Sequence, residues 1–202
     1  KENIIQMGVL ENSVREHLDV SARRVMAVLD PLKVTLINWP GDRSEELPAR
    51  NHPNQPEQGE RQLRLTREIY IERSDFMENP PRKFFRLRPG GEVRLRYGYI
   101  IKCEQVIKDA AGEVTELLCS YDPDTRSGAA GGQRKVKGTI HWVSAETSQQ
   151  AEVRLYDRLF TVPRPGAGSD SDDFRDALNP ESLVVMTGCR VEPSLVQAGN
   201  EQ

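Results

Sequence analysis

The stretch that decides the fold is Gly91-Glu-Val-Arg-Leu-Arg-Tyr-Gly-Tyr99. Apolar and charged residues alternate in it, which is the period-two pattern of a strand with one face on a core and the other in solvent. Val93 and Leu95 are therefore expected on one face, and Arg94 and Arg96 on the other. The stretch predicts a half-buried β-strand.

The same alternation recurs in short segments along most of the chain. Turn-forming residues separate these segments, and Asp109-Ala-Ala-Gly112 suits a hairpin between two of them. Many short strands spaced by turns favour small barrels or a sandwich over a doubly wound sheet. The predicted strands are residues 34–39, 68–73, 92–102, 114–121, 135–143, 152–160 and 183–188.

A helical period precedes the strands. Leu10, Val14 and Leu18 recur every four residues, which predicts a helix from residue 9 to about residue 29, where Asp30 and a proline follow. The longer connectors are rich in polar residues, proline or glycine, and we expect them to be surface loops. These connectors are residues 40–62, 122–134 and 163–181.

Composition indicates a water-soluble globular chain, since 37% of the residues are apolar and 29% are charged. There is no run of 18 apolar residues, and the first residues lack the pattern of a signal peptide. We therefore expect a cytoplasmic protein without a membrane partner.

Cysteine and histidine spacing indicates neither disulfides nor a metal site. The cysteines lie far apart between apolar residues, so we expect buried free thiols. No histidine has a partner at a zinc spacing, so no metal ligand is predicted. These residues are Cys103, Cys119, Cys189, His17, His52 and His141.

Charge is unevenly distributed. The chain carries 28 basic and 31 acidic residues, a net charge of −3 that alone argues against a nucleic-acid partner. Between Arg82 and Lys102, however, seven basic residues are opposed by Glu92 alone. Such a local patch can bind a polyanion although the whole chain is acidic.

Motifs for nucleotide binding and nucleophilic catalysis are absent. The sequence has no Gly-x-x-x-x-Gly-Lys-Ser/Thr loop and no Gly-x-Ser-x-Gly turn, and Gly166-Ala-Gly168 lacks the third glycine of a dinucleotide fingerprint. We therefore predict no catalytic residue in this chain.

The basic strand around Arg94 and Arg96 has the chemistry of an RNA-binding surface. Planar guanidiniums suit base edges and phosphates, and exposed aromatic rings suit splayed bases. Solvated arginines paired with acids of a neighbouring strand would show the same spacing, and spacing alone leaves both interpretations open. The aromatic residues nearby are Phe84, Phe85, Tyr97 and Tyr99.

Several long motifs carry a family resemblance. They are Arg24-Val-Met-Ala-Val-Leu-Asp-Pro31, Asn51-His-Pro-Asn54, Ile69-Tyr-Ile-Glu-Arg-Ser-Asp-Phe76, Gly91-Glu-Val-Arg-Leu-Arg96, Ser120-Tyr-Asp-Pro-Asp-Thr125, Lys135-Val-Lys-Gly-Thr-Ile-His-Trp-Val-Ser144, Val153-Arg-Leu-Tyr-Asp-Arg-Leu-Phe160, Asn179-Pro-Glu-Ser-Leu183 and Glu192-Pro-Ser-Leu195. In content and order these motifs resemble the C-terminal, anticodon-binding half of the glutaminyl-tRNA synthetases, which are class I aminoacyl-tRNA synthetases.

The resemblance implies an all-β fold of two small antiparallel β-barrels, near and far, with a short helical N-terminal lead-in. Residues 1–22 would form the lead-in. Residues 23–80 and 151–202 would form the near barrel, and residues 81–150 the far barrel inserted between them.

It also implies a set of anticodon-binding residues. Arg24 resembles the arginine that holds the middle base, with Asn54 close by. Arg86 matches an arginine associated with the third base, and Arg94 and Arg96 match the pair near the first base.

Two positions depart from the family pattern. Lys83 stands where a glutamine contacts RNA, and Phe85 stands where a lysine does. We keep Lys83 among the predicted anticodon-binding residues, while the contacts made at these two positions stay open.

The implied function is recognition of the glutamine tRNA by a monomer, next to the catalytic domain of the same glutamine–tRNA ligase. Segments resembling the His-Ile-Gly-His and Lys-Met-Ser-Lys-Ser signatures are absent, so we expect this chain to hold no cofactor and to be inactive, with ATP and Mg²⁺ used by the parent enzyme. The chain ends at Gln202, before the family's Phe-x-Phe-Glu-Arg segment, so we expect the near barrel to lack its closing strand.

Two alternatives remain at this stage. The archaeal and eukaryotic type of glutamyl-tRNA synthetase shares the barrel architecture, although His141-Trp-Val-Ser144 favours glutamine. A protein-interaction β-module without an RNA role is the other, and salt-dependent RNA binding would separate it from both synthetases.

Overall fold

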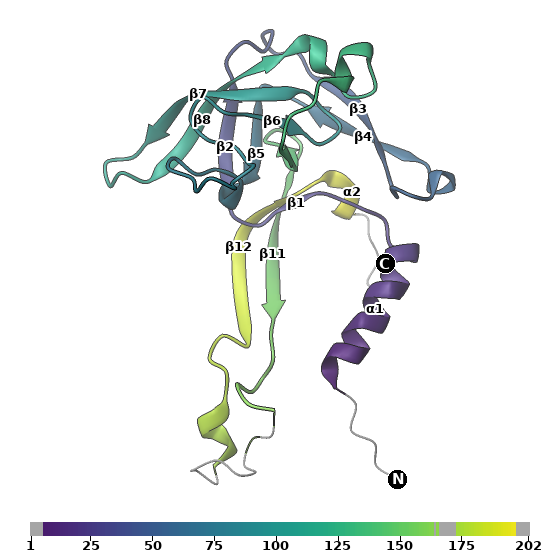
Figure 1. The fold of residues 1–202 in the computed structure, drawn as a ribbon, viewed down its shortest axis with the longest axis vertical. Coiled ribbons are helices and arrows are strands. Elements are labelled where there is room, and N and C mark those ends of the chain that lie inside the picture. Colours follow the sequence, from purple (N-terminus) through teal and green to yellow (C-terminus); the bar gives the residue numbers. More distant parts are fainter. Residues whose placement is uncertain (1–5, 164, 166–172, 197–202) are drawn as a thin grey trace.

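The computed structural model describes residues 6–163, 165 and 173–196. Strands dominate it, so the prediction of an all-β fold with a helical lead-in is confirmed (Figure 1). Neither of the α-helices in the described residues is long and apolar enough to cross a membrane. The elements are α1 (Met7–Ser21), β1 (Ala27–Val28), β2 (Pro31–Leu36), β3 (Glu45–Arg50), β4 (Glu60–Leu65), β5 (Glu68–Glu72), β6 (Glu92–Leu95), β7 (Ile100–Lys108), β8 (Val114–Asp122), β9 (Thr139–Ile140), β10 (Trp142–Ser144), β11 (Gln149–Tyr156), β12 (Leu183–Val191) and α2 (Pro193–Val196), with 3₁₀ turns η1 (Pro56–Gln58), η2 (Arg73–Asp75), η3 (Pro123–Thr125), η4 (Ala130–Gln133) and η5 (Phe174–Ala177).

Seven strands form the main sheet, in the order β10-β5-β2-β8-β7-β6-β9. Most neighbouring strands are antiparallel, but β2 pairs with β8 and β6 pairs with β9 in parallel. The sheet is therefore mixed, whereas the family resemblance implied antiparallel strands throughout. The two end strands, β9 and β10, are separated in the chain by His141 alone. The sheet therefore curls until its ends meet at one residue, which makes it a nearly closed barrel.

Alternating residues fill the barrel. Val93 and Leu95 of β6 are fully buried, as the sequence pattern predicted, and Trp142 of β10 packs among them. The predicted strand 92–102 is nevertheless interrupted, because the chain turns between β6 and β7. The amide of Gly98 donates to the carbonyl of Leu95 in this turn, and Tyr97 has φ 64°.

A β-hairpin, β3–β4, occupies much of the connector that we expected to be a loop. Leu47 and Ala49 of β3 pair with Leu63 and Arg61 of β4, and the three apolar side chains are buried. The loop prediction for residues 40–62 was wrong because glutamate, arginine and proline fill the outward positions and mask the alternation. Packing against the neighbouring strand determines whether such a segment forms a strand more than its amino-acid composition does.

The Asp109–Gly112 hairpin is confirmed. The amide of Gly112 donates to the carbonyl of Asp109, and Gly112 has φ +86°, in the left-handed region that favours glycine. The strands on either side, β7 and β8, place Cys103 opposite Cys119 although they are distant in sequence. All three cysteines are buried and free, as predicted.

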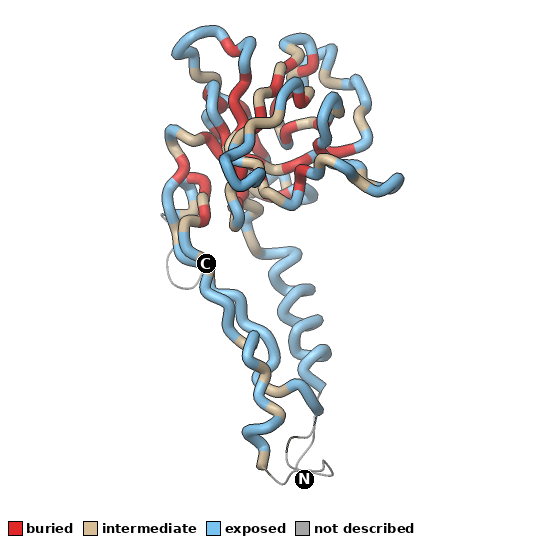
Figure 2. The backbone as a smooth tube through the Cα atoms, turned by 90° about the vertical axis from the view of Figure 1, so that its left-hand side faces the viewer, coloured by how far each residue is buried: buried red, intermediate tan, exposed pale blue. Residues whose placement is uncertain are grey.

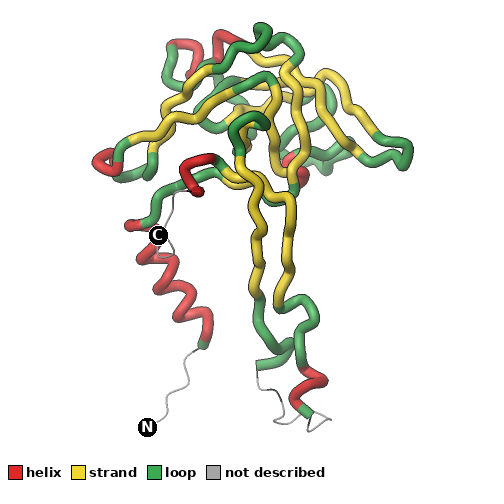
Figure 3. Tube along the Cα trace, turned by 180° about the vertical axis from the view of Figure 1, so that it is seen from behind, coloured by secondary structure: helices red, strands yellow, loops and turns green. Residues whose placement is uncertain are grey.

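A second, three-stranded sheet has the order β1-β12-β11. Its long strands β11 and β12 run side by side away from the barrel (Figure 3). Most of their residues far from the barrel are exposed, including Tyr156 and Val185 (Figure 2).

The main sheet crosses the predicted boundary between residues 80 and 81. Strand β2 pairs with β8, and β5 pairs with β10, so hydrogen bonds join the two predicted barrels. The division into near and far barrels stays a prediction.

The helix α1 is shorter than predicted and has no buried residue. It ends at Ser21, because Ala22 is already extended and the next apolar residues, Met26 and Val28, are buried beside the sheets. Leu10 is 57% exposed, so the apolar stripe that predicted the helix faces solvent in this chain (Figure 2).

Candidate functional site

The six predicted binding residues lie around the barrel in different surroundings. Arg24 lies between α1 and β1, and Asn54 lies in the β3–β4 hairpin loop. Lys83 and Arg86 belong to the segment between β5 and β6, Arg94 lies on β6, and Arg96 starts the turn that follows. Their contacts show which donors remain available.

Arg24 closes the C-terminal end of α1. Its Nη2 donates to Asp19 Oδ1 at 2.5 Å and to the Asp19 carbonyl at 3.1 Å. A cation at the last turn of a helix stabilises the carbonyl end. His52 reaches the same carbonyl through Nε2 at 2.7 Å, while the amide of Asn54 donates to His52 Nδ1 at 3.2 Å. Arg24 and Asn54 are thus linked through the Asp19 carbonyl and buried His52, a residue to which the sequence assigned no role.

Arg86 is oriented by a carboxylate that the sequence did not single out. Its Nη1 lies 3.1 Å from Asp75 Oδ1, and Nδ1 of His141 lies 3.9 Å from Oδ2. The Asp75 side chain is only 7% exposed. Burial raises the pKa of the Asp75 carboxyl, and the charges of Arg86 and His141 partly oppose this shift. The Arg86 side chain is 52% exposed, so it is anchored on one side and open on the other.

Arg94 is occupied by the protein itself. Its Nη1 donates to the carbonyl of Thr125 at 2.6 Å, and its Nη2 donates to the carbonyls of Gly132 and Arg134 at 3.1 and 2.9 Å. Burial, with a smaller contribution from the charge of Arg134, lowers the pKa of the Arg94 guanidinium. We call this arrangement the Arg94 cage, since it fixes the connector between β8 and β9.

The neighbouring turn separates an open cation from a buried ring. The guanidinium of Arg96 lies 5.5 Å from the ring centre of Tyr97, at cation–π distance, and Arg96 is exposed. Tyr99 is 5% exposed and packs against Trp39 and Tyr121, with ring centres 6.3 and 5.2 Å away. The interpretation of Tyr99 as a surface for bases was therefore wrong, because the turn directs it into the core.

A basic groove of about 530 Å³ lies beside Arg86. Among the described residues that line it, Glu92 is the acid, and Arg134 neutralises it at 2.7 Å. The volume is in the range of about 300–1,000 Å³ typical of ligand sites. The groove residues are Pro80, Pro81, Arg82, Phe84, Phe85, Arg86, Arg88, Gly91, Glu92, Lys135, Val136 and Lys137.

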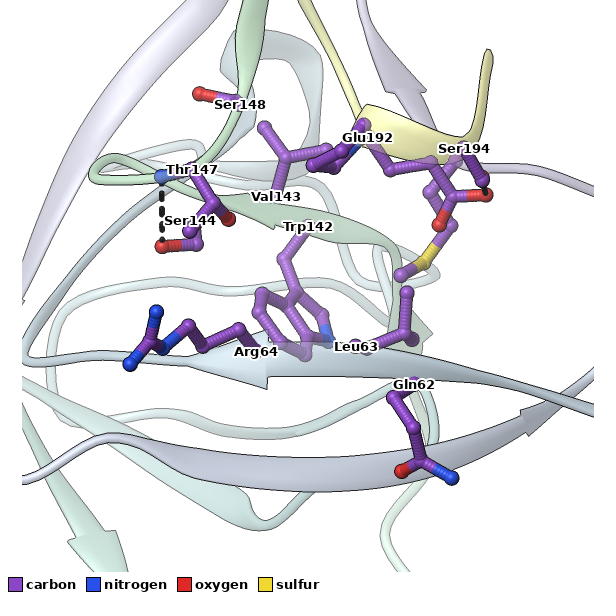
Figure 4. A pocket seen from close by; sticks show the side chains of 12 residues that line it. Gln62, Leu63, Arg64, Trp142, Val143, Ser144, Thr147, Ser148, Glu192 and Ser194 are labelled. Carbon is purple, nitrogen blue, oxygen red and sulfur yellow. Dashed lines mark hydrogen bonds between the residues drawn. The ribbon is translucent and has the colours of Figure 1, made fainter. Parts of the chain in front are cut away.

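A smaller, mostly apolar cavity of about 120 Å³ lies under α2 (Figure 4). Trp142 and Leu63 form part of its wall, and Glu192 joins it to the hairpin through an ion pair with Arg61 at 2.8 Å. None of the six predicted residues lines this cavity. No group of three or more His, Cys, Asp or Glu side chains within the described part of the chain could hold a metal ion.

Two family models match the chain, over residues 22–122 and 139–202. Both describe the anticodon-binding domain of class I tRNA synthetases of the E and Q type. The chain belongs to this family. The resemblance that the sequence motifs indicated is thereby confirmed, and the basic groove is a feature of an anticodon-binding domain.

Curated relatives of this anticodon-binding domain are named glutamine–tRNA ligase. The protein from Rhodopirellula baltica is 56% identical over 189 residues, which are 94% of this chain and 31% of the relative. The one from Nitrobacter winogradskyi is 54% identical over 193 residues, 96% of this chain and 34% of the relative. That from Neisseria meningitidis is 56% identical over 190 residues, 92% of this chain and 34% of the relative. The chain thus spans about a third of these relatives.

Proposed function

We propose that this chain binds the anticodon of the glutamine tRNA as part of a glutamine–tRNA ligase. The observation that carries the proposal is the basic groove, in which arginine, lysine and phenylalanine side chains line one hollow of an acidic protein. Surfaces that bind single-stranded RNA combine cations, which bind the phosphates, with exposed aromatic rings, on which the bases stack. Family membership and the relatives' names support the choice of tRNA and of glutamine.

The proposed contacts with the anticodon bases are based on the family resemblance and on which side chains are open to solvent. Arg96 and Arg86 would contact the first and third bases, since both are open to solvent. Arg24 and Asn54 would hold the middle base at the end of α1, and Lys83 is an exposed cation on the same β5–β6 segment as Arg86. Arg94 would act near the first base mainly by shaping the cage, because the protein uses its Nη donors.

We infer that the parent protein is a monomeric cytoplasmic ligase that consumes ATP with Mg²⁺. The described residues of this chain do not fit either group, since they offer neither a metal-ligand cluster nor a nucleotide-binding motif. Attachment of glutamine is therefore assigned to the catalytic domain, in the part of the ligase that this chain does not span.

A tRNA titration tests the proposal. The chain should bind the glutamine tRNA more tightly than the glutamate tRNA or a tRNA with an unrelated anticodon, and its affinity should fall as salt rises. A preference for the glutamate tRNA would favour the glutamyl enzyme, which the same family model covers. Absence of salt-dependent binding to any tRNA would leave a protein-interaction module.

A further inference from the structure

Phe85 is the most conspicuous apolar residue of the basic groove. It is 50% exposed in a hollow whose charged side chains are cationic except for Glu92. The Nζ atom of Lys137 lies 5.4 Å from the centre of its ring, at cation–π distance. A half-exposed ring among solvated charges contributes little to the core and leaves part of its surface open to a ligand.

The two walls of the groove approach each other closely through their backbones. A Cβ atom added to Gly138 would lie 2.0 Å from the carbonyl oxygen of Phe85, so only glycine allows this approach. The carbonyl of Gly138 also accepts from the amide of Arg94 on β6. On the other wall, the amide of Phe84 donates to the carbonyl of Pro81 in a turn. These contacts therefore set where the Phe85 backbone lies in the groove.

The charges around the ring define what can lie on it. Arg88, Lys135 and Lys137 are exposed, and Glu92 is neutralised by Arg134. A purely apolar partner would have to desolvate these cations, which is costly. A flat aromatic group attached to a phosphate would satisfy both the ring and the cations.

We propose that Phe85 is a stacking platform for one unpaired base of the anticodon loop, with Lys135, Lys137 and Arg88 binding the adjoining phosphates. This proposal rests on the proposed function and deepens it, because it names a contact for Phe85, one of the two positions whose contacts the family resemblance left open. The stacked base lies next to the one that Arg86 contacts, since Arg86 lines the same groove. Stacking accepts any base, so the contact adds affinity without sequence preference.

The test measures binding of the full chain to the glutamine tRNA and to tRNAs that lack the base at each anticodon-loop position in turn. Phe85→Ala should weaken binding of the intact tRNA by about 5- to 150-fold, and Phe85→Trp should stay within about twofold of the wild type. Phe85→Leu should lose as much as Phe85→Ala, since it keeps apolar volume without a ring face. At one loop position, removal of the base should weaken the wild type but not Phe85→Ala, as expected for two groups in contact.

Phe174→Ala is the matched control, because Phe174 is 55% exposed on η5, outside the groove. It should bind like the wild type. Wild-type affinity of Phe85→Ala would overturn the stacking proposal while leaving the proposed function intact. A loss in Phe85→Ala that couples to no single base would also overturn it. Failure of the wild-type chain to bind any tRNA would remove the proposed function and the stacking proposal together.

Discussion

The Arg94 cage and the basic groove use the same kind of side chain in opposite ways. In the cage, carbonyls of the β8–β9 connector take up the guanidinium of Arg94. In the groove, Asp75 holds one side of Arg86 and leaves the other side open. Only eight positions separate the two arginines. The difference shows that an arginine in an RNA-binding region can build the surface or serve as part of it, and that its partners decide which.

Arg94→Ala should have the largest effect, and the effect should be on folding. Loss of the guanidinium leaves the backbone carbonyls of Thr125, Gly132 and Arg134 without their charged donor, so we expect the free energy of unfolding to fall by about 2–4 kcal/mol. Urea unfolding measures this. Binding to tRNAs changed singly at each anticodon base should weaken by a similar factor for all. A selective loss at the first base, with unchanged stability, would show that Arg94 contacts that base directly.

Arg86→Ala should alter selectivity more than stability. An arginine that pairs with a base edge discriminates by about 1–3 kcal/mol, so preference for the wild-type third base should drop by this amount. Titrations with tRNAs changed at each anticodon base measure it. Arg82→Ala is the matched control, because Arg82 lines the same groove and should weaken all these tRNAs alike. The wild-type order of preference in Arg86→Ala would reduce Arg86 to a surface charge.

Arg96→Ala should leave the fold almost unchanged. Its cation–π contact with Tyr97 is exposed, so we expect a loss in unfolding free energy of at most about 1 kcal/mol. The preference for the first anticodon base should fall in the same binding assay. Equal losses of stability in Arg96→Ala and Arg94→Ala would remove the distinction between cage and open surface.

Asp75→Asn should change the acid limb of the stability curve. Because burial raises the folded pKa of Asp75 above its ordinary value of 3.8, the folded state takes up this proton more readily than the unfolded state. Its contribution is thus fully present below pH 3.8 and is lost as pH rises through the raised folded pKa. The difference in unfolding free energy between wild type and Asp75→Asn should show that fall, and a rise with pH across this window would contradict it.

The sequence predicted the features that depend on residues close together in the chain. Val93 and Leu95 lie inside the barrel, and Asp109–Gly112 forms a turn, because period and turn chemistry are local. Contacts between distant segments left no local signal. Asp75, Arg86 and His141 meet only after the sheet has curled, and Tyr99 turns inward only because of the reversal at Tyr97. The sequence did not predict the β3–β4 hairpin, because the glutamate, arginine and proline residues on its outward face mask the alternation of its buried apolar residues.

The closure of the barrel at His141 determines where this domain can tolerate inserted or deleted residues. Ile140 and Trp142 are both buried, and His141 alone carries the chain from one end of the sheet to the other. One inserted residue would turn Trp142 from the core to the solvent or break its pairing with Ile71. Natural insertions and deletions should therefore be excluded between residues 139 and 143, and should accumulate at exposed turns such as Asp109–Gly112, where an extra residue only lengthens a loop.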